Sequence, residues 1–139
     1  TLEEGVNFVI KSMITMRGGE LFVPKIPSFK ILDLAKAVAP GVKTKIVGIR
    51  AGEKIHEEMI TKSDSLNTFE FKDHYIILSN AVYHDNLELS SYKTKEYIKS
   101  VQAKGGKLLK KEFSYNSQTN PRFLSVEEIK KYIKKLELK

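Results

Sequence analysis

Apolar residues along the chain recur at helical spacing in some stretches and with the alternation of a strand in others. In the first stretch the spacing predicts a helix to about Met16, with an apolar stripe of Leu2, Val6, Val9, Met13 and Ile14. Thr1-Leu2-Glu3-Glu4 has the spacing of a capping box, and Arg17-Gly18-Gly19 provides glycines that end a helix. We expect the apolar stripes of this and the later helices to form core.

Between residues 20 and 60, strands and helices are predicted to alternate. The predicted elements are a short buried strand at Leu21–Val23 stopped by Pro24, a helix over Ile31–Val38, a strand at Thr44–Ile49 and a helix that contains Ile55, Met59 and Ile60. Such alternation favours parallel α/β pairing over an all-helical or all-β domain.

From Thr61 onward the pattern is less regular. The predicted elements are a polar loop at Ser63–Asn67, a hairpin of strands at Phe69–Phe71 and Tyr75–Leu78, a loop at Asn80–Tyr92, a helix over Thr94–Ala103, an extended piece around Phe113 and Tyr115, and a last helix from Val126 to Leu136. Ser125-Val126-Glu127-Glu128 is a second capping box, which marks the start of the last helix.

The candidate chemistry lies in the turn that follows the predicted strand at Thr44–Ile49. Arg50 carries a planar guanidinium that suits the paired oxygens of a phosphate. Gly52 permits a sharp turn, and Glu53 can accept hydrogen bonds from a pair of sugar hydroxyls. The carboxyl end of a strand is where open α/β sheets bind ligands. Residue types alone nevertheless favour a surface turn with a weak Arg–Glu ion pair.

The composition is ordinary for a globular protein, and the chain is long enough to form one domain with a core. Of 139 residues, 41% are hydrophobic and 29% are charged. The net charge of +7 comes mostly from lysines, many of them in the last helix, and arginine occurs only three times. Surfaces that read nucleic acid usually combine arginine with aromatic residues, so a solvated helix face is favoured and no nucleic-acid partner is expected.

Cysteine usage and hydropathy exclude several further classes. The sequence contains no cysteine, and no apolar run approaches the roughly 18 residues of a membrane span. Acidic Glu3 and Glu4 stand where a signal peptide would carry a basic region. We therefore expect no disulfide and no membrane partner, and a cytoplasmic location.

The sequence shows no assembled catalytic apparatus. The glycine pairs Gly18-Gly19 and Gly105-Gly106 lack the spacing of a dinucleotide-binding turn, and no Gly-Lys-Ser/Thr loop or Tyr-x-x-x-Lys pair occurs. His56, His74 and His84 lie far apart without the spacing of metal ligands. We therefore predict no catalytic residue, no metal site and no cofactor bound by this chain.

Several segments follow one another at the spacing of a known family. They are Thr1–Val6, Gly18–Lys25, Ile31–Ala35 and Gly48–Glu57, with a similar tail at Tyr115–Asn120 and Phe123–Glu128. Together they resemble the C-terminal, substrate-binding half of the nucleotide-sugar 4,6-dehydratases of the extended short-chain dehydrogenase/reductase superfamily, and most closely the inverting branch that acts on UDP-N-acetylglucosamine. Each segment alone is a weak signal, whereas four in order are fairly specific.

The resemblance implies which residues bind substrate. In the family's Arg-x-Gly-Asp/Glu turn these residues contact pyrophosphate and ribose, and they correspond to Arg50 and Glu53. Val23, Pro24 and Lys25 match the family's loop near the nucleotide base, although Lys25 could equally be solvated. With the resemblance included, diphosphate recognition is favoured over the bland ion pair.

The sequence also departs from the family pattern at one position of this turn and leaves other roles open. Ala51 stands where the family usually has proline, so the turn is less constrained before ligand binds. Tyr115, Ser117 and Asn120 could line a sugar pocket, form an oligomer contact or make an ordinary turn.

The fold that the resemblance implies is α/β, with a small mixed sheet flanked by helices. It corresponds to the substrate-binding part of an extended short-chain dehydrogenase/reductase, without the glycine-rich Rossmann half. We expect residues 1–139 to form a single substrate-binding domain, as a fragment of a longer enzyme. Residues 1–60 would be an α/β part with the nucleotide-sugar motifs, and 61–139 a strand pair, loops and the C-terminal helix.

The expected function is to hold UDP-N-acetylglucosamine in an enzyme that makes a 4-keto-6-deoxy sugar for pseudaminic acid or surface polysaccharide synthesis. NADP, or NAD, and the catalytic Tyr-x-x-x-Lys pair would belong to an N-terminal half, so this chain alone would be inactive. Expected partners are the UDP-sugar, that half, and further copies in a homo-oligomer. Two alternatives stay open, namely the substrate half of a UDP-sugar 4-epimerase or related capsule or O-antigen epimerase, and a non-enzymatic basic binding module.

Overall fold

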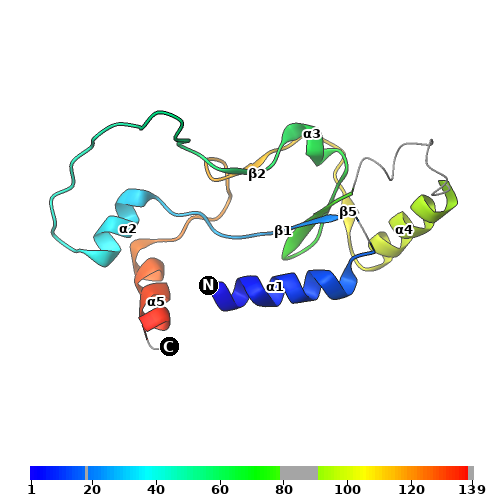
Figure 1. Cartoon of the computed structure of the whole chain (residues 1–139), viewed down its shortest axis with the longest axis horizontal. Coiled ribbons are helices and arrows are strands. Elements are labelled where there is room, and N and C mark those ends of the chain that lie inside the picture. Colours follow the sequence, from blue (N-terminus) through cyan, green and yellow to red (C-terminus); the bar gives the residue numbers. More distant parts are fainter. Residues whose placement is uncertain (18, 79–90, 138–139) are drawn as a thin grey trace. The chain divides into compact units, whose positions relative to one another are not determined.

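The computed structural model describes residues 1–17, 19–78 and 91–137 of the chain (Figure 1). It divides into two compact units, each made of two separate segments of sequence. Unit 1 contains Thr1–Lys25 and Met59–Ser114, and unit 2 contains Ile26–Glu58 and Tyr115–Lys139. The expected single domain with parts at 1–60 and 61–139 stays a prediction. The expected class, α/β with small sheets and helices, is confirmed.

Unit 1 is built on a four-stranded sheet. Its strands, in spatial order, are β1 (Leu21–Pro24), β4 (His74–Ile77), β3 (Thr68–Glu70) and β5 (Lys107–Leu108). Neighbouring strands are antiparallel, with Val23 opposite Tyr75 and Phe69 opposite Ile76. The predicted hairpin and the predicted strand after residue 20 are therefore confirmed.

The expected parallel pairing of the first strands is wrong. The reason is that β1 pairs with β4, which follows it by some fifty residues, and not with the next predicted strand at Thr44–Ile49. That stretch forms no strand. Ile46 and Val47 are 88% and 82% exposed, so the β-branched alternation there meets no partner strand among the described residues.

The core of unit 1 lies between the sheet and α4 (Ser91–Ala103). The buried residues of this core are Phe69, Ile76, Leu78 and Val101, with Phe22, Phe71 and Ile98 packed against them. The predicted helix over Thr94–Ala103 is confirmed and begins three residues earlier. The predicted loop before it falls mostly outside the described residues.

Helix α1 (Leu2–Thr15) begins with the predicted capping box. The Glu4 N–H donates to Oγ1 of Thr1 at 3.2 Å, and the Thr1 nitrogen donates to a Glu4 carboxylate oxygen at 2.8 Å. The expectation that its apolar stripe forms core is wrong, because no residue of α1 is buried and Ile14 is 79% exposed. The helical residues that pack in the core of unit 1 come from α4 and not from α1. Helix α1 contacts β4 through the rings of Phe8 and His74.

In unit 2, α2 (Ile31–Val38) packs against α5 (Val126–Glu137), and both helices are confirmed predictions (Figure 1). The second capping box is also confirmed, since the Ser125 N–H donates to the Glu128 carboxylate at 2.8 Å and the Glu128 N–H donates to Oγ of Ser125 at 3.3 Å. A parallel bridge between Ser28 and Phe123 joins the two segments of the unit.

Three short elements were not predicted, and one predicted helix is absent. β2 (Glu58–Ile60) occupies the end of the stretch predicted as a helix, and with β6 (Tyr115–Asn116) it makes a two-stranded sheet. The helical prediction there is wrong. α3 (Lys62–Ser65) replaces part of the predicted polar loop, because Oγ1 of Thr61 accepts from the Asp64 N–H at 3.3 Å and caps a helical turn. The third element that was not predicted is the two-residue strand β5.

In the described part of the chain, no helix combines the length and the apolar character needed to cross a membrane.

Candidate functional site

The turn that carries Arg50 is closed by its own residues. The Arg50 N–H donates to Oε2 of Glu53 at 3.0 Å, and the Glu53 N–H donates to the Arg50 carbonyl at 3.1 Å. Gly52 has a φ of +80°, a left-handed backbone that favours glycine. Local hydrogen bonds thus form a turn at the predicted position. The strand predicted before it and the helix predicted after it are absent.

The Glu53 carboxylate accepts a hydrogen bond from the backbone N–H of Arg50 and not from its guanidinium. Among the described residues, none forms an ion pair with Arg50, so the expected weak Arg–Glu ion pair is replaced by a carboxylate-to-backbone bond. Arg50 is exposed on the turn. An exposed guanidinium on a closed turn can present its parallel N–H donors to an anion.

The other predicted substrate residues lie at the end of β1, in unit 1. Val23 is only 4% exposed and faces core. The Lys25 ammonium lies 2.7 Å from a Glu70 carboxylate oxygen and 4.6 Å from the centre of the Tyr75 ring. The backbone N–H of Lys25 also donates to the Asp73 carbonyl at 2.9 Å. Lys25 is therefore tied to its own sheet, and a role for Val23, Pro24 and Lys25 near a nucleotide base stays a prediction.

The predicted site residues thus fall into two sets. Arg50 and Glu53 meet in one turn of unit 2, and Val23, Pro24 and Lys25 share a strand end of unit 1. Among the described residues, no group of three histidine, aspartate or glutamate side chains is arranged to hold a metal.

Tyr115 and Asn120 tie the start of unit 2 to its second segment. The Tyr115 hydroxyl accepts from the Ile26 N–H and donates to the Ile26 carbonyl, each at 2.8 Å. The side-chain amide of Asn120 donates to the same carbonyl at 2.8 Å and to Oγ of Ser28 at 3.0 Å. Both residues are nearly buried. Their polar atoms are engaged by backbone, so they fix the loop that follows β1.

Ser117 holds the chain just after the Arg50 turn. Its N–H donates to the Glu57 carbonyl at 2.8 Å, and its Oγ accepts from the Glu57 N–H at 3.1 Å. The same Oγ lies 3.4 Å from Nδ1 of His56. Sequence reasoning left these roles open; the only signal was the cluster of polar residues between Asn116 and Pro121, which is typical of a turn.

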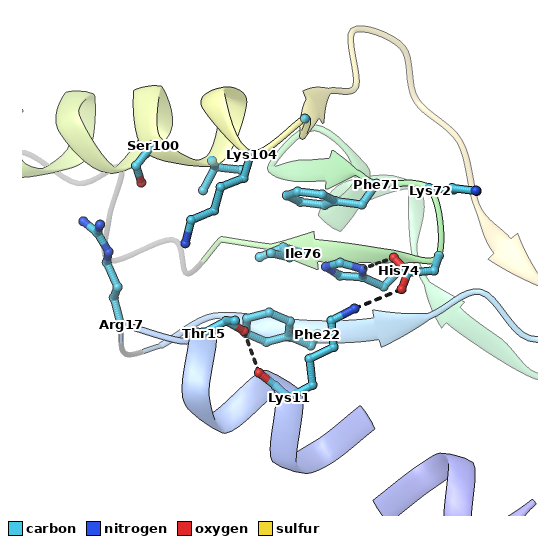
Figure 2. A pocket seen from close by; sticks show the side chains of 13 residues that line it. Lys11, Thr15, Arg17, Phe22, Phe71, Lys72, His74, Ile76, Ser100 and Lys104 are labelled. Atoms are coloured by element: carbon cyan, nitrogen blue, oxygen red, sulfur yellow. Dashed lines mark hydrogen bonds and ion pairs between the residues drawn. The ribbon is translucent and has the colours of Figure 1, made fainter. Parts of the chain in front are cut away.

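Unit 1 also contains a cavity of about 440 Å³ between α1, the sheet and the end of α4 (Figure 2). His74 lies in its wall with its side chain 12% exposed, and Nδ1 is 2.7 Å from a carboxylate oxygen of Asp73. The Lys11 ammonium lies 3.1 Å from the other oxygen of Asp73. The hydrogen bond from His74, followed by that from Lys11, lowers the pKa of Asp73 from 3.8 to about 2.

Comparison with known families places the chain in one class. Residues 1–79, more than half of the chain, match the family described as "Polysaccharide biosynthesis protein". The chain belongs to this family.

Its relatives include two proteins from Campylobacter jejuni subsp. jejuni that are named UDP-N-acetylglucosamine 4,6-dehydratase (inverting). They come from serotypes O:2 and O:23/36 and are 43% and 44% identical to this chain over 129 residues. The alignment covers 93% of this chain and 36% of each relative, so the chain spans about a third of their length. The resemblance noted from the sequence is confirmed.

Two further comparisons are less close in sequence. A protein from Rickettsia canadensis named UDP-glucose 4-epimerase is 36% identical over 81 residues, which are 55% of this chain and 24% of that protein. The solved structure "X-ray structure of Pen from Bacillus thuringiensis" is 28% identical, with a TM-score of 0.72, and the match covers 100% of this chain and 38% of that one. This likeness supports the α/β fold described above.

Proposed function

We propose that this chain is the nucleotide-sugar-binding portion of a UDP-N-acetylglucosamine 4,6-dehydratase. The parent enzyme would be an NADP-dependent lyase, cytoplasmic and homo-oligomeric, that makes a 4-keto-6-deoxy sugar for pseudaminic acid or surface polysaccharide synthesis. The observation that carries the proposal is the identity of 43% across 93% of the chain to a protein of that name. An epimerase parent is the weaker alternative, because the epimerase relative aligns over 55% of the chain at 36% identity.

The Arg50 turn supports the assignment of the substrate. A diphosphate presents paired anionic oxygens, and the guanidinium is the side chain that binds such pairs with two parallel hydrogen bonds. Because Glu53 closes the turn through the backbone, the guanidinium remains at its exposed tip. We assign Arg50 to the pyrophosphate of the UDP-sugar and Glu53 to the turn and to the ribose beside it. Val23, Pro24 and Lys25 are assigned to the region of the base.

The cofactor is assigned to another part of the parent enzyme. The chain contains no glycine-rich turn of the dinucleotide-binding spacing, and Gly106 is packed against Phe71 and Val101 and not open to a phosphate. When bound elsewhere in the parent, NADP would accept and return the hydride. The residues described here would bind and orient the nucleotide part of the substrate, with the nucleotide-binding half as their partner.

Binding of UDP to the 139-residue chain tests the role of Arg50. We expect Arg50→Ala to weaken binding by about 1.5–3 kcal/mol, the usual value of a hydrogen bond to a charged group, or roughly tenfold to 150-fold in Kd. Isothermal titration calorimetry measures the change. Arg122→Ala is the matched control, because it removes another exposed arginine of the same unit. The Arg122 side chain is 66% exposed, and its ion pair with Glu128 is long, at 4.0 Å. Equal affinities of the Arg50→Ala variant and the unmodified chain would remove Arg50 from the site.

The division of labour is tested by activity. The isolated chain, supplied with NADP and UDP-N-acetylglucosamine, is expected to form no 4-keto-6-deoxy sugar, and product analysis by NMR measures this. The parent enzyme with Arg50→Ala is expected to show a raised KM for the UDP-sugar. Turnover by the isolated chain would contradict the proposal. Tight DNA or RNA binding that falls steeply with salt would favour a basic binding module.

A further inference from the structure

Helix α1 turns its more polar side toward the sheet of its own unit. Phe8 and Ser12 are the two half-buried residues of the helix, and the Phe8 ring contacts the His74 ring of β4 with centroids 6.0 Å apart. The Lys11 ammonium is 3.1 Å from a carboxylate oxygen of Asp73, and Figure 2 shows the Lys11 side chain directed from α1 toward the sheet. Positions 8, 11 and 12 are three or four residues apart or adjacent, so they share one side of the helix.

The apolar residues of α1 lie on the side of the helix that is turned away from this contact. Successive residues are rotated by about 100°, which places the large apolar residues opposite positions 8, 11 and 12. We call this set the outer face of α1, and it consists of Leu2, Val6, Val9, Ile10, Met13 and Ile14. Their side chains are between 49% and 84% exposed. An apolar stripe of this width is typical of a helix that packs on a core, yet none of the described residues buries it.

The charges on α1 favour a protein surface over a lipid surface as the cover of its outer face. Helices that lie on a membrane usually carry several lysines or arginines on their polar side. Helix α1 has three charged residues, namely Glu3, Glu4 and Lys11, and the lysine is ion-paired with Asp73. The helix therefore offers lipid headgroups no basic side chain beyond one that already has a carboxylate partner.

The length of the relatives indicates which protein surface covers the outer face. The chain spans 36% of each Campylobacter jejuni relative, so nearly two thirds of such a protein lies outside these residues. Interfaces that stay closed resemble a domain core cut in half, and the outer face has this apolar character. A surface in the same polypeptide also has a high effective concentration. The remainder of the same polypeptide is therefore favoured over a second copy of the chain.

We propose that the outer face of α1 is the surface on which the nucleotide-binding half of the parent enzyme docks, with Val6, Ile10 and Met13 at the centre of the contact. This inference rests on the proposed function, which supplies that half as the partner. Helix α1 then lies between two layers, with Phe8 on the sheet of unit 1 and the outer face on the partner. The apolar stripe of α1 thus joins the cofactor-binding part of the enzyme to unit 1.

Thiol labelling tests this surface, because the chain contains no cysteine of its own. In the isolated chain, Ile10→Cys and Met13→Cys should react with N-ethylmaleimide at a rate within about threefold of Lys99→Cys, the control on the exposed surface of α4. In the parent enzyme both should react at least about tenfold more slowly, because a buried thiol reacts only after local opening, and Lys99→Cys should change less than about twofold. Mass spectrometry of the labelled peptides measures each rate. Hydrogen exchange of the unmodified proteins is a second measurement, and the α1 amides should exchange more slowly in the parent.

Two results would overturn the docking surface. One is labelling of both positions, and exchange of the α1 amides, as fast in the parent as in the isolated chain. The other is slow labelling of the isolated chain that depends on its concentration, because a second copy would then cover the outer face. Product formation by the parent tests the proposed function separately. A parent that forms the 4-keto-6-deoxy sugar while α1 stays reactive rejects the docking surface alone, and a parent that protects α1 but forms no such product supports docking and rejects the assigned reaction.

Discussion

The Arg50 N–H donates to the Glu53 carboxylate at 3.0 Å, while the Glu53 N–H donates to the Arg50 carbonyl at 3.1 Å. The two residues therefore close their turn in both directions without an ion pair between side chains. In this arrangement the acid shapes the backbone and the guanidinium stays at the exposed tip. The Arg-x-Gly-Glu spacing of this turn has a local physical reason, because the glycine at the third position adopts a φ of +80°.

This relationship predicts a graded effect of Glu53 substitutions on UDP binding. Glu53→Ala removes the acceptor for the Arg50 N–H, so we expect UDP affinity to fall by about 1 kcal/mol, the net value of one hydrogen bond. Glu53→Gln keeps an acceptor oxygen and should lose clearly less. Calorimetry on both variants measures the difference. A loss as large in Glu53→Gln as in Glu53→Ala would assign the carboxylate charge to the ligand and not to the turn.

Tyr115 is predicted to stabilise unit 2 through its hydroxyl. It is 7% exposed and bonds both the N–H and the carbonyl of Ile26. Tyr115→Phe leaves the ring in place and deprives these groups of a partner, so we expect a loss of about 1–3 kcal/mol in unfolding free energy. Urea unfolding measures it. Tyr132→Phe on α5 is the control, since its hydroxyl has no hydrogen bond to any described residue, and its stability should be unchanged. A similar stability of the two variants would contradict the role of Tyr115.

Local sequence signals predicted much of this fold. Both capping boxes, the three long helices that they or glycine delimit, and the hairpin at Phe69–Leu78 follow from short-range chemistry, and they are present. The failures needed information from distant residues. Thr44–Ile49 has the composition of a strand, but a strand requires a partner, and none of the described residues provides one. Conversely, β1 finds its partner in β4, which no local pattern indicates.

The candidate site shows the same limit. Arg50 and Glu53 could be paired from their spacing, because their hydrogen bonds span three residues. The contacts of Ser117 with Glu57 and of Tyr115 with Ile26 span 60 and 89 residues, so nothing in the local sequence indicated them. The stripe on α1 illustrates the reverse error. Its period predicted a helix correctly but could not show which surface, if any, covers it.

Asp73 predicts a loss of stability in acid. Its pKa is lowered from 3.8 to about 2, so its bonds to His74 and Lys11 stabilise the fold above about pH 4 and are lost as the pH falls from about 4 to about 2. Because the side chain is 61% exposed, screening reduces the contribution to about 1 kcal/mol. Urea unfolding at pH 5 and pH 2.5 should show a smaller decrease for Asp73→Asn than for the unmodified chain. Equal decreases would show that Asp73 is not the group responsible.

Gly106 is predicted to tolerate no side chain. A Cβ there would lie 2.7 Å from Cζ of Phe71 and 2.8 Å from Cγ1 of Val101. Phe71 is held by its stack on His74 and Val101 is core, so neither can move without disturbing packing. We expect Gly106→Ala to destabilise the protein by about 1–3 kcal/mol, as overpacked cores do. Gly5→Ala is the matched control, because nothing lies within 4 Å of a Cβ placed at Gly5 in the first turn of helix α1, and it should stabilise by up to roughly 0.5–1 kcal/mol. Thermal unfolding of both variants decides the matter, since a Gly106→Ala protein as stable as the parent would mean that the end of α4 does not pack on the hairpin as described.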